Sequence, residues 1–295
     1  MDSDRQRDID RPTVGRLSRL ELRARLAMEG YYSGIHKSPY HGFNVEFAEY
    51  REYAPGDDLR YLDWRVMAKS DRLFIKQFEA ETNLSCYLLL DASESMDFTT
   101  NDDTRLDYGA SLAAALSLLM LRQGDQVGLV VFDNAVRQFI PPRGSARHFG
   151  AIVDALEQVK PGKDTNIAAV LHEMAERVRR RSMVIIISDF FDDVDAVLNS
   201  LQHFRFRHNE VIVLHLLDEA ELSFPFDRVT LFEGMERGER VVVDPHIMAE
   251  GYRRRFEEFL KDFRHGCTEK NIDYELMTLS QPFDRALSAY LARRK

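Results

Sequence analysis

From Leu84 onward, short apolar runs alternate with longer segments of helical periodicity. The apolar runs have the length of strands and carry apolar residues at consecutive positions, which is typical of parallel strands buried on both faces. They are Leu84–Leu90, Gln126–Phe132, Met183–Ser188, Val211–Leu217 and Tyr274–Leu279. This alternation predicts an α/β fold with a doubly wound, mainly parallel sheet that carries helices on both faces.

The segments between these runs have the spacing of helices. They are Arg105–Arg122, Ala146–Gln158, Ile167–Arg180, Val194–Phe206 and Ile247–Arg264. The first is apolar on nearly every side around Ala110–Leu121, so we expect it to be central and covered. Two further β-type runs, Val229–Phe232 and Arg240–Val243, predict a hairpin before the last long helix.

The first part of the chain has a different sequence pattern. Residues 30–82 contain short alternations, aromatic residues and a turn signal at Pro55-Gly56-Asp57-Asp58. They predict a small β-rich appendage that buries Trp64 and has a charged network. In that network Arg51 or Arg60 pairs with Asp57, Asp58 or Asp63; we favour a structural role for it over a second functional site. We therefore divide the chain into residues 1–83, an N-terminal helix with this appendage, and residues 84–295, the α/β domain.

A helix is also predicted over Val14–Met28, where apolar residues recur at helical spacing among several arginines. The favoured interpretation is a helix docked on its own protein through one apolar stripe. The alternative is a basic amphipathic helix that makes peripheral contact with a membrane surface.

Charge and composition exclude several classes of protein. Lys and Arg total 40 against 49 Asp and Glu, a formal net charge of −9, which argues against a general nucleic-acid binder. No apolar run approaches the roughly 18–20 residues of a transmembrane helix, and the polar N-terminus does not resemble a signal peptide. The two cysteines, Cys86 and Cys267, fit a reducing compartment. We expect a soluble, cytoplasmic protein.

Oxygen-bearing side chains gather where buried strands end. Asp91, Ser93 and Ser95 follow the first strand, Asp189 follows the strand Met183–Ser188, and Thr165 lies in a loop just before a helix. Because the carboxyl ends of parallel strands meet at one edge of a sheet, we expect these five side chains to converge. An all-oxygen set suits a hard cation, and Mg²⁺ fits better than zinc.

The hydroxyl groups in this set matter because they are neutral ligands. A cation held mainly by hydroxyls keeps much of its positive charge and can attract a carboxylate from a partner. The alternative interpretation of Asp91-Ala92-Ser93-Glu94-Ser95 is a turn whose Ser and Asp side chains cap the next segment. Other known motifs are missing: the sequence has no GxGxxG after a strand and no GxSxG elbow.

From Leu84 to the C-terminus the sequence resembles a von Willebrand factor A domain with a metal-ion-dependent adhesion site. DASES would supply Asp91, Ser93 and Ser95, the loop GKDT Thr165, and the strand end ISD Asp189. The resemblance implies that hydroxyls contact the metal (Mg²⁺, or another divalent cation such as Mn²⁺ or Ca²⁺). It also implies that the aspartates act largely through water and that a partner's Asp or Glu completes the shell.

The region before Leu84 makes the family resemblance more specific. Three segments there resemble the signature of the domain of unknown function 58 family, in its short soluble branch. They are REY from Arg51, PGDD from Pro55 with the R and DW that follow it, and FEAE from Phe78. The resemblance implies a MoxR-type AAA+ ATPase as partner. We therefore expect a metal-dependent protein-interaction module, not an enzyme. The alternative function is a Mg²⁺-dependent hydrolase or phosphatase with Asp91 as its nucleophile.

Overall fold

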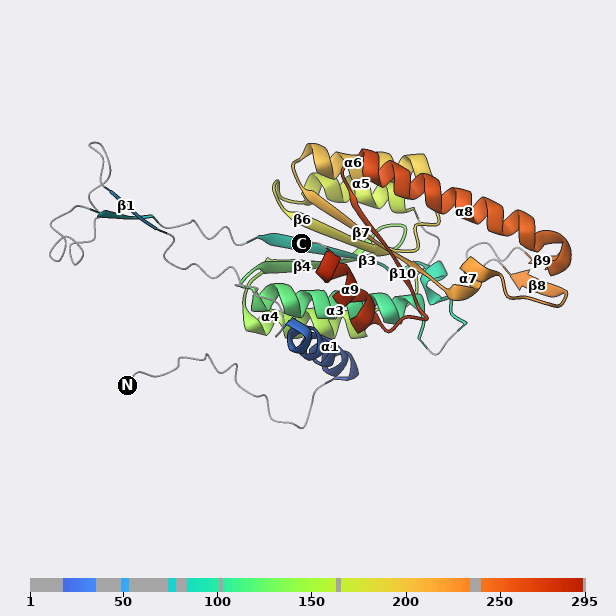
Figure 1. Ribbon diagram of the computed structural model, residues 1–295, viewed down its shortest axis with the longest axis horizontal. Coiled ribbons are helices and arrows are strands. Elements are labelled where there is room, and N and C mark those ends of the chain that lie inside the picture. The colour runs from blue at the N-terminus through green and yellow to red at the C-terminus, as the bar shows by residue number, and fades with distance from the viewer. Residues whose placement is uncertain are drawn as a thin grey trace.

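The computed structural model describes residues 18–35, 49–52, 74–77, 84–100, 103–162, 166–233 and 240–293. At its centre is a six-stranded sheet of order β10-β7-β6-β3-β4-β5 (Figure 1). Neighbouring strands are parallel except β5, which pairs with β4 antiparallel at one edge. The strands are β3 (Ser85–Asp91), β4 (Gln126–Phe132), β5 (Val136–Arg143), β6 (Met183–Ser188), β7 (Glu210–Leu217) and β10 (Asp273–Thr278). The predicted fold class is confirmed.

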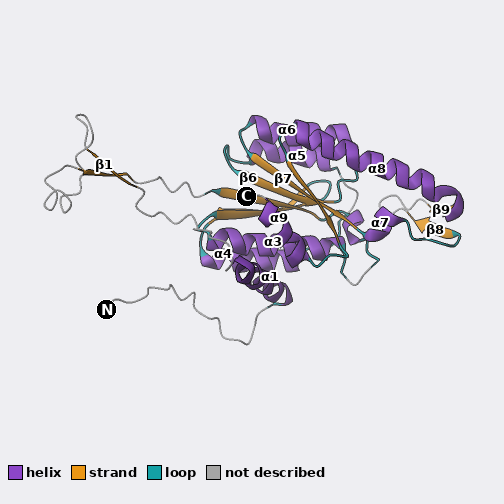
Figure 2. Ribbon diagram, in the orientation of Figure 1, coloured by secondary structure: helices purple, strands orange, loops and turns teal. Residues whose placement is uncertain are grey.

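Helices cover both faces of the sheet, which forms the middle layer (Figure 2). One face packs against α1 (Arg19–Ile35), α3 (Arg105–Arg122), α4 (Ala146–Glu157) and α9 (Phe283–Arg293). The other packs against α5 (Ile167–Arg177), α6 (Val194–Phe206) and α8 (Pro245–Glu269). Because successive strand residues point to opposite faces, Leu88 and Leu90 enter the first core and Leu89 enters the second. This is why the strands are apolar at consecutive positions.

The central helix α3 begins and ends where its sequence signals predict. Thr104 caps it: its hydroxyl accepts from the backbone N–H of Asp107, and the Asp107 carboxylate accepts from that of Thr104. Gly124, with φ of +87°, lies just beyond its last turn. Gly109 faces the sheet, where an added Cβ would lie 2.9 Å from Cδ1 of Leu90, so its missing side chain lets the helix approach closely.

Several short elements depart from the predictions. Strand β5 was not predicted, because its mostly exposed sequence, VRQFIPPR, lacks the apolar run of a buried strand. The short helix α7 (Glu219–Ser223), the 3₁₀ turn η2 (Glu94–Asp97) and α9 were also missed. The predicted hairpin is confirmed as the antiparallel pair β8 (Thr230–Glu233) and β9 (Arg240–Val243).

The N-terminal region is described only in part. Helix α1 lies further along the chain than the predicted Val14–Met28, and its Ala24, Ala27 and Met28 are buried in the core beside α3. This confirms the favoured interpretation of a docked helix. Strands β1 (Glu49–Glu52) and β2 (Phe74–Gln77) pair antiparallel.

The predictions for the appendage concern mainly residues outside the described ranges, Trp64, Asp57, Asp58, Arg60 and Asp63 among them. The division of the chain at residue 83 stays a prediction. Within the described ranges, no helix is long and apolar enough to cross a membrane.

Candidate functional site

The candidate site lies where the strand order of the sheet reverses. Strands β3 and β6 are parallel neighbours, and the chain winds outward from them in opposite directions. Asp91 is the last residue of β3, and Asp189 directly follows β6. Open α/β sheets bind their ligands at the carboxyl ends of strands at such a switch point. The predicted placement of these two aspartates at one edge is confirmed.

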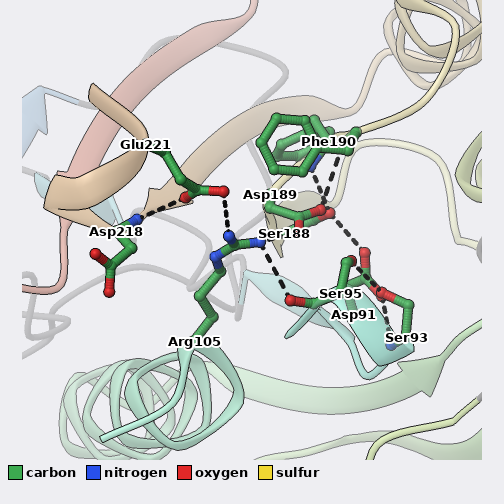
Figure 3. Close-up of polar contacts among 10 residues, drawn as sticks. Asp91, Ser93, Ser95, Arg105, Ser188, Asp189, Phe190, Asp218 and Glu221 are labelled. Atoms are coloured by element: carbon green, nitrogen blue, oxygen red, sulfur yellow. Dashed lines mark hydrogen bonds and ion pairs between the residues drawn. The ribbon is translucent and has the colours of Figure 1, made fainter. Parts of the chain in front are cut away.

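Asp91 is fully buried, and both of its carboxylate oxygens accept hydrogen bonds (Figure 3). Oδ1 accepts from the backbone N–H of Ser93 at 2.9 Å, and Oδ2 accepts from the hydroxyl of Ser188 at 2.6 Å. The Ser188 hydroxyl in turn accepts from the backbone N–H of Phe190 at 2.9 Å. These contacts fix the orientation of the Asp91 carboxylate.

The hydroxyls of Ser93 and Ser95 lie side by side, with their Oγ atoms 3.0 Å apart. Adjacent ligands in an octahedron with metal–oxygen distances of about 2.1 Å are about 3.0 Å apart, which is the geometry of Mg²⁺. The two hydroxyls are hydrogen-bonded to each other, and their spacing is also compatible with two neighbouring ligands of one small cation. Ser93 is fully buried, whereas Ser95 is half-buried, so the pair reaches from the interior toward the surface.

Thr165, the fifth predicted ligand, lies outside the described residues. The chain just before it comes to the site, because the backbone N–H of Gly162 donates to the carbonyl oxygen of Ala92 at 2.6 Å. Gly162 is also pressed against Asp133: an added Cβ would lie 2.1 Å from Asp133 Oδ2. Any side chain at position 162 would therefore force Asp133 or the loop to shift.

Arg105, in the first turn of α3, is a component of the site that the sequence reasoning missed. Its guanidinium is buried, donates to the carboxylates of Asp189 and Glu221, and contacts the carbonyl oxygen of Ser95 at 3.2 Å (Figure 3). The ring of Phe98 lies against it, 5.0 Å from ring centroid to Cζ. Arg105 thus joins the ends of β3 and β6 to helix α7.

Charge in this buried cluster is unbalanced. The carboxylates of Asp189 and Glu221 pair with the one guanidinium, and two more carboxylates lie beside them, Asp91 near Asp189 and Asp218 near Glu221. Burial, reinforced by the charge of Asp189, raises the pKa of Asp91 to about 7. Burial also raises the pKa of Glu221, although the Arg105 charge opposes that shift. A divalent cation beside Asp91 would favour the ionised form of this buried carboxyl group, so the residues present fit a metal of this kind.

This site differs in composition from most transition-metal sites. Among the described residues, no group of three or more His, Cys, Asp or Glu side chains is placed to hold a metal ion. Any cation here would depend on the serine hydroxyls beside Asp91. Hard cations such as Mg²⁺ accept oxygen ligands of this kind.

The sequence contained weak signals for the missed residues. Arg105 is a charged residue in the first turn of a mostly apolar helix, and Ser188 immediately precedes the strand-end Asp189. Glu221 occupies the third position after the N-cap Asp218, which makes a capping box. Only the tertiary structure shows that Arg105 links Glu221 to Asp189.

The strand order, with one antiparallel edge strand, and the Asp-x-Ser-x-Ser segment at the switch point define a von Willebrand factor A-like domain. The chain belongs to the family described as Protein of unknown function DUF58, whose model matches residues 49–266. The resemblance inferred from the sequence is thereby confirmed. The uncharacterized protein Rv1480 of Mycobacterium tuberculosis is 30% identical over 222 residues, which cover 74% of this chain and 69% of that protein.

Solved structures with a similar fold are more distant in sequence. The conserved hypothetical protein BatB from Bacteroides thetaiotaomicron is 17% identical, with a TM-score of 0.48, over 71% of this chain and 98% of that one. The SpRpn10 VWA domain is 11% identical, with a TM-score of 0.41, over 70% and 94% of the two chains.

Proposed function

We propose that this chain is a metal-dependent protein-interaction module. A divalent cation, Mg²⁺ first among them, would bind at the ends of β3 and β6 and attract a carboxylate from a partner protein. The observation that carries the proposal is the pair of serine hydroxyls 3.0 Å apart beside the buried Asp91. Neutral hydroxyl ligands would leave the cation attractive to an acidic partner.

Each side chain has a distinct part in this proposal. Ser93 and Ser95 would hold the cation directly, and Asp91 would supply charge from an orientation fixed by Ser188. Asp189 is engaged by Arg105 and would act through its charge. Thr165 is included on the basis of the family resemblance. The bound cation supplies positive charge at the surface, which a partner's Asp or Glu would neutralise.

We further propose a MoxR-type AAA+ ATPase as the partner whose Asp or Glu binds the cation; a client protein that offers an Asp or Glu is the alternative occupant. Membership in the DUF58 family supports this choice, because the resemblance to that family implies such an ATPase. A partner bound through one cation and a few neighbouring contacts would dissociate readily when the metal is removed. An adaptor that passes clients to an ATPase needs reversible binding of this kind.

The geometry gives less support to a hydrolase that uses Asp91. A nucleophilic carboxylate needs an oxygen that can reach the substrate. Asp91 is fully buried, and its two oxygens are occupied by Ser188 and Ser93. The cationic group of the site, Arg105, is itself buried between Asp189 and Glu221. A protein-interaction module, by contrast, needs no change in the contacts of Asp91 and Arg105.

The test is capture of the MoxR-type ATPase of the same organism on the immobilised full chain, in Mg²⁺ and in EDTA. We expect retention in Mg²⁺, loss in EDTA, and loss with Asp91→Ala even in Mg²⁺. Phosphatase activity on a phosphate ester is measured in the same samples. ATPase binding that persists in EDTA, together with phosphate-ester hydrolysis that requires Asp91, would overturn the proposal in favour of the hydrolase.

A further inference from the structure

A cavity of about 300 Å³ opens beside the candidate metal site. Its lining is aromatic and aliphatic and includes Phe98, Phe224, Phe226, Val243, Met248 and Tyr252. The Phe224 ring packs against those of Phe226 and Tyr252, at centroid distances of 5.1 and 4.8 Å. The cavity is thus a cluster of rings with room for one large side chain, formed by η2, α7, β9 and α8.

One guanidinium joins this cavity to the metal site. Arg105 contacts two residues of the cavity wall, Glu221 through an ion pair and Phe98 through its ring. The same guanidinium contacts Ser95 and Asp189 of the metal site. Figure 3 shows Arg105 between Glu221 of the cavity wall and the residues of the metal site. The Arg105 side chain therefore links the wall of the cavity directly to the residues of the cation site.

The charge of Glu221 does not prevent an acidic partner segment from binding across the cavity and the metal site. The Glu221 carboxylate in the wall is paired with Arg105, so its repulsion of another carboxylate is reduced. The cavity itself favours an apolar group, because burial of apolar surface is the main source of affinity in such pockets.

The surface around the cavity is also apolar. Val242 and Ile247, each next in sequence to a lining residue, are 68% and 77% exposed. Leu231 pairs across the hairpin with Val242 and is 55% exposed. Apolar side chains exposed together beside a pocket are characteristic of a protein-docking surface.

We propose that this cavity receives a large apolar side chain of the same partner segment whose carboxylate binds the cation, an inference that rests on the proposed function. The partner would thus carry an Asp or Glu together with a Phe, Tyr, Trp or Leu. Since an extended chain advances about 3.5 Å per residue, the two side chains would lie within about four positions of each other. The metal would fix the acidic residue, and the cavity would select its neighbour.

A peptide-display experiment tests this specificity directly. Random heptapeptides are selected on the immobilised full chain in Mg²⁺ and eluted with EDTA. We expect enrichment of sequences that combine one acidic residue with one large apolar residue. An enriched peptide is then synthesised with its apolar residue intact or replaced by serine, and its affinity is measured by fluorescence anisotropy.

Two chain variants complete the experiment. Met248→Asp places a charge at the cavity wall, and Phe206→Asp places one on α6, outside the cavity lining; both parent side chains are more than half exposed. We expect Met248→Asp, and serine in the peptide, each to weaken binding about tenfold or more. Phe206→Asp should leave the affinity unchanged, and thermal melts should show that both variants fold.

The outcomes separate this inference from the proposed function. EDTA-sensitive peptides that share only an acidic residue, and that bind Met248→Asp as well as wild type, would overturn the role of the cavity and leave the metal site standing. Peptides that stay bound in EDTA and are released only by a subsequent acid wash would, if they dominate the selection, overturn the metal-dependent function as well. Failure to enrich any peptide in Mg²⁺ would count against both.

Discussion

Arg105 and Asp189, 84 positions apart in the chain, form an ion pair in which both side chains are almost completely buried. The pair fastens the start of α3 to the carboxyl end of β6, directly beside Asp91. It also places a fixed positive charge within a cluster of buried and half-buried carboxylates. Stability and metal affinity should therefore both depend on Arg105.

Replacing Arg105 by Gln should destabilise the fold strongly. Removing one partner of a buried ion pair leaves an uncompensated charge and costs roughly 3–5 kcal/mol, and here both Asp189 and Glu221 would lose their partner. Urea unfolding measures this loss. The matched control is Arg23→Gln, whose ion pair with Asp103 is partly exposed and should cost less than about 1 kcal/mol. Equal losses of unfolding free energy in the two variants would show that the buried ion pair contributes no more to stability than the partly exposed one.

Replacing Ser188 by Ala should weaken Mg²⁺ binding without removing a ligand. Its hydroxyl orients Asp91, and loss of such an outer-shell contact lowers metal affinity by roughly 10- to 100-fold. Calorimetric titration of Mg²⁺ measures the change. Ser117→Ala is the control, because Ser117 is an equally buried serine that donates to the carbonyl of Ala113 within α3. An unchanged Mg²⁺ affinity in Ser188→Ala would contradict the positioning role of Ser188.

Replacing Gly162 by Ala should disturb the loop that approaches the site. The added Cβ would clash with Asp133, and overpacking of this kind typically costs about 1–3 kcal/mol. The control is Gly150→Ala in α4, where no atom lies within 4 Å of the added Cβ; it should stabilise the helix by up to about 1 kcal/mol. Thermal or urea unfolding distinguishes the two. A Gly162→Ala variant as stable as wild type would show that the loop can move away from Asp133 freely.

His215 should make the protein less stable in acid. Its side chain is fully buried in β7 among aromatic rings and lies 3.0 Å from the Tyr274 hydroxyl. Burial lowers the pKa of His215 from 6.5 to about 3. Below pH 6.5 the unfolded chain therefore binds a proton that the folded chain does not. The stability that neutral His215 provides is complete above pH 6.5 and is lost as the pH falls toward 3.

His215→Phe removes this dependence. The stability of the variant relative to wild type should rise by up to roughly 1.4 kcal/mol for each pH unit below 6.5. Urea unfolding of both proteins, at a neutral pH and at successively lower values, gives the difference. A difference that stays constant with pH would mean that His215 binds its proton as readily in the folded chain as in the unfolded chain, which would contradict the lowered pKa.

The sequence was informative where one local pattern decides the structure. Strands β4 and β6 and helices α3 and α6 were predicted with the bounds that they have, because apolar runs and helical periodicity are continuous there. Asp91 and Asp189 were placed at one edge because parallel strands end together. The edge strand β5 was missed because an edge strand needs no apolar run on both faces.

The remaining features of the site depend on contacts between distant segments. Nothing near Arg105 in the sequence indicates Asp189 or Glu221 as its partners. The cavity likewise forms only when η2, α7, β9 and α8 come together. A local sequence pattern contains no information on contacts between distant segments, so these contacts are seen only in the three-dimensional structure.

The most direct test of the central claim is a calorimetric titration of Mg²⁺ into the full chain and into a variant with both Ser93→Ala and Ser95→Ala. We expect one Mg²⁺ site in the wild-type protein and none in the variant. The circular dichroism should be unchanged, because both hydroxyls lie at a strand-end loop outside the two apolar cores. Equal Mg²⁺ binding by both proteins, or no Mg²⁺ binding by the wild type, would contradict it.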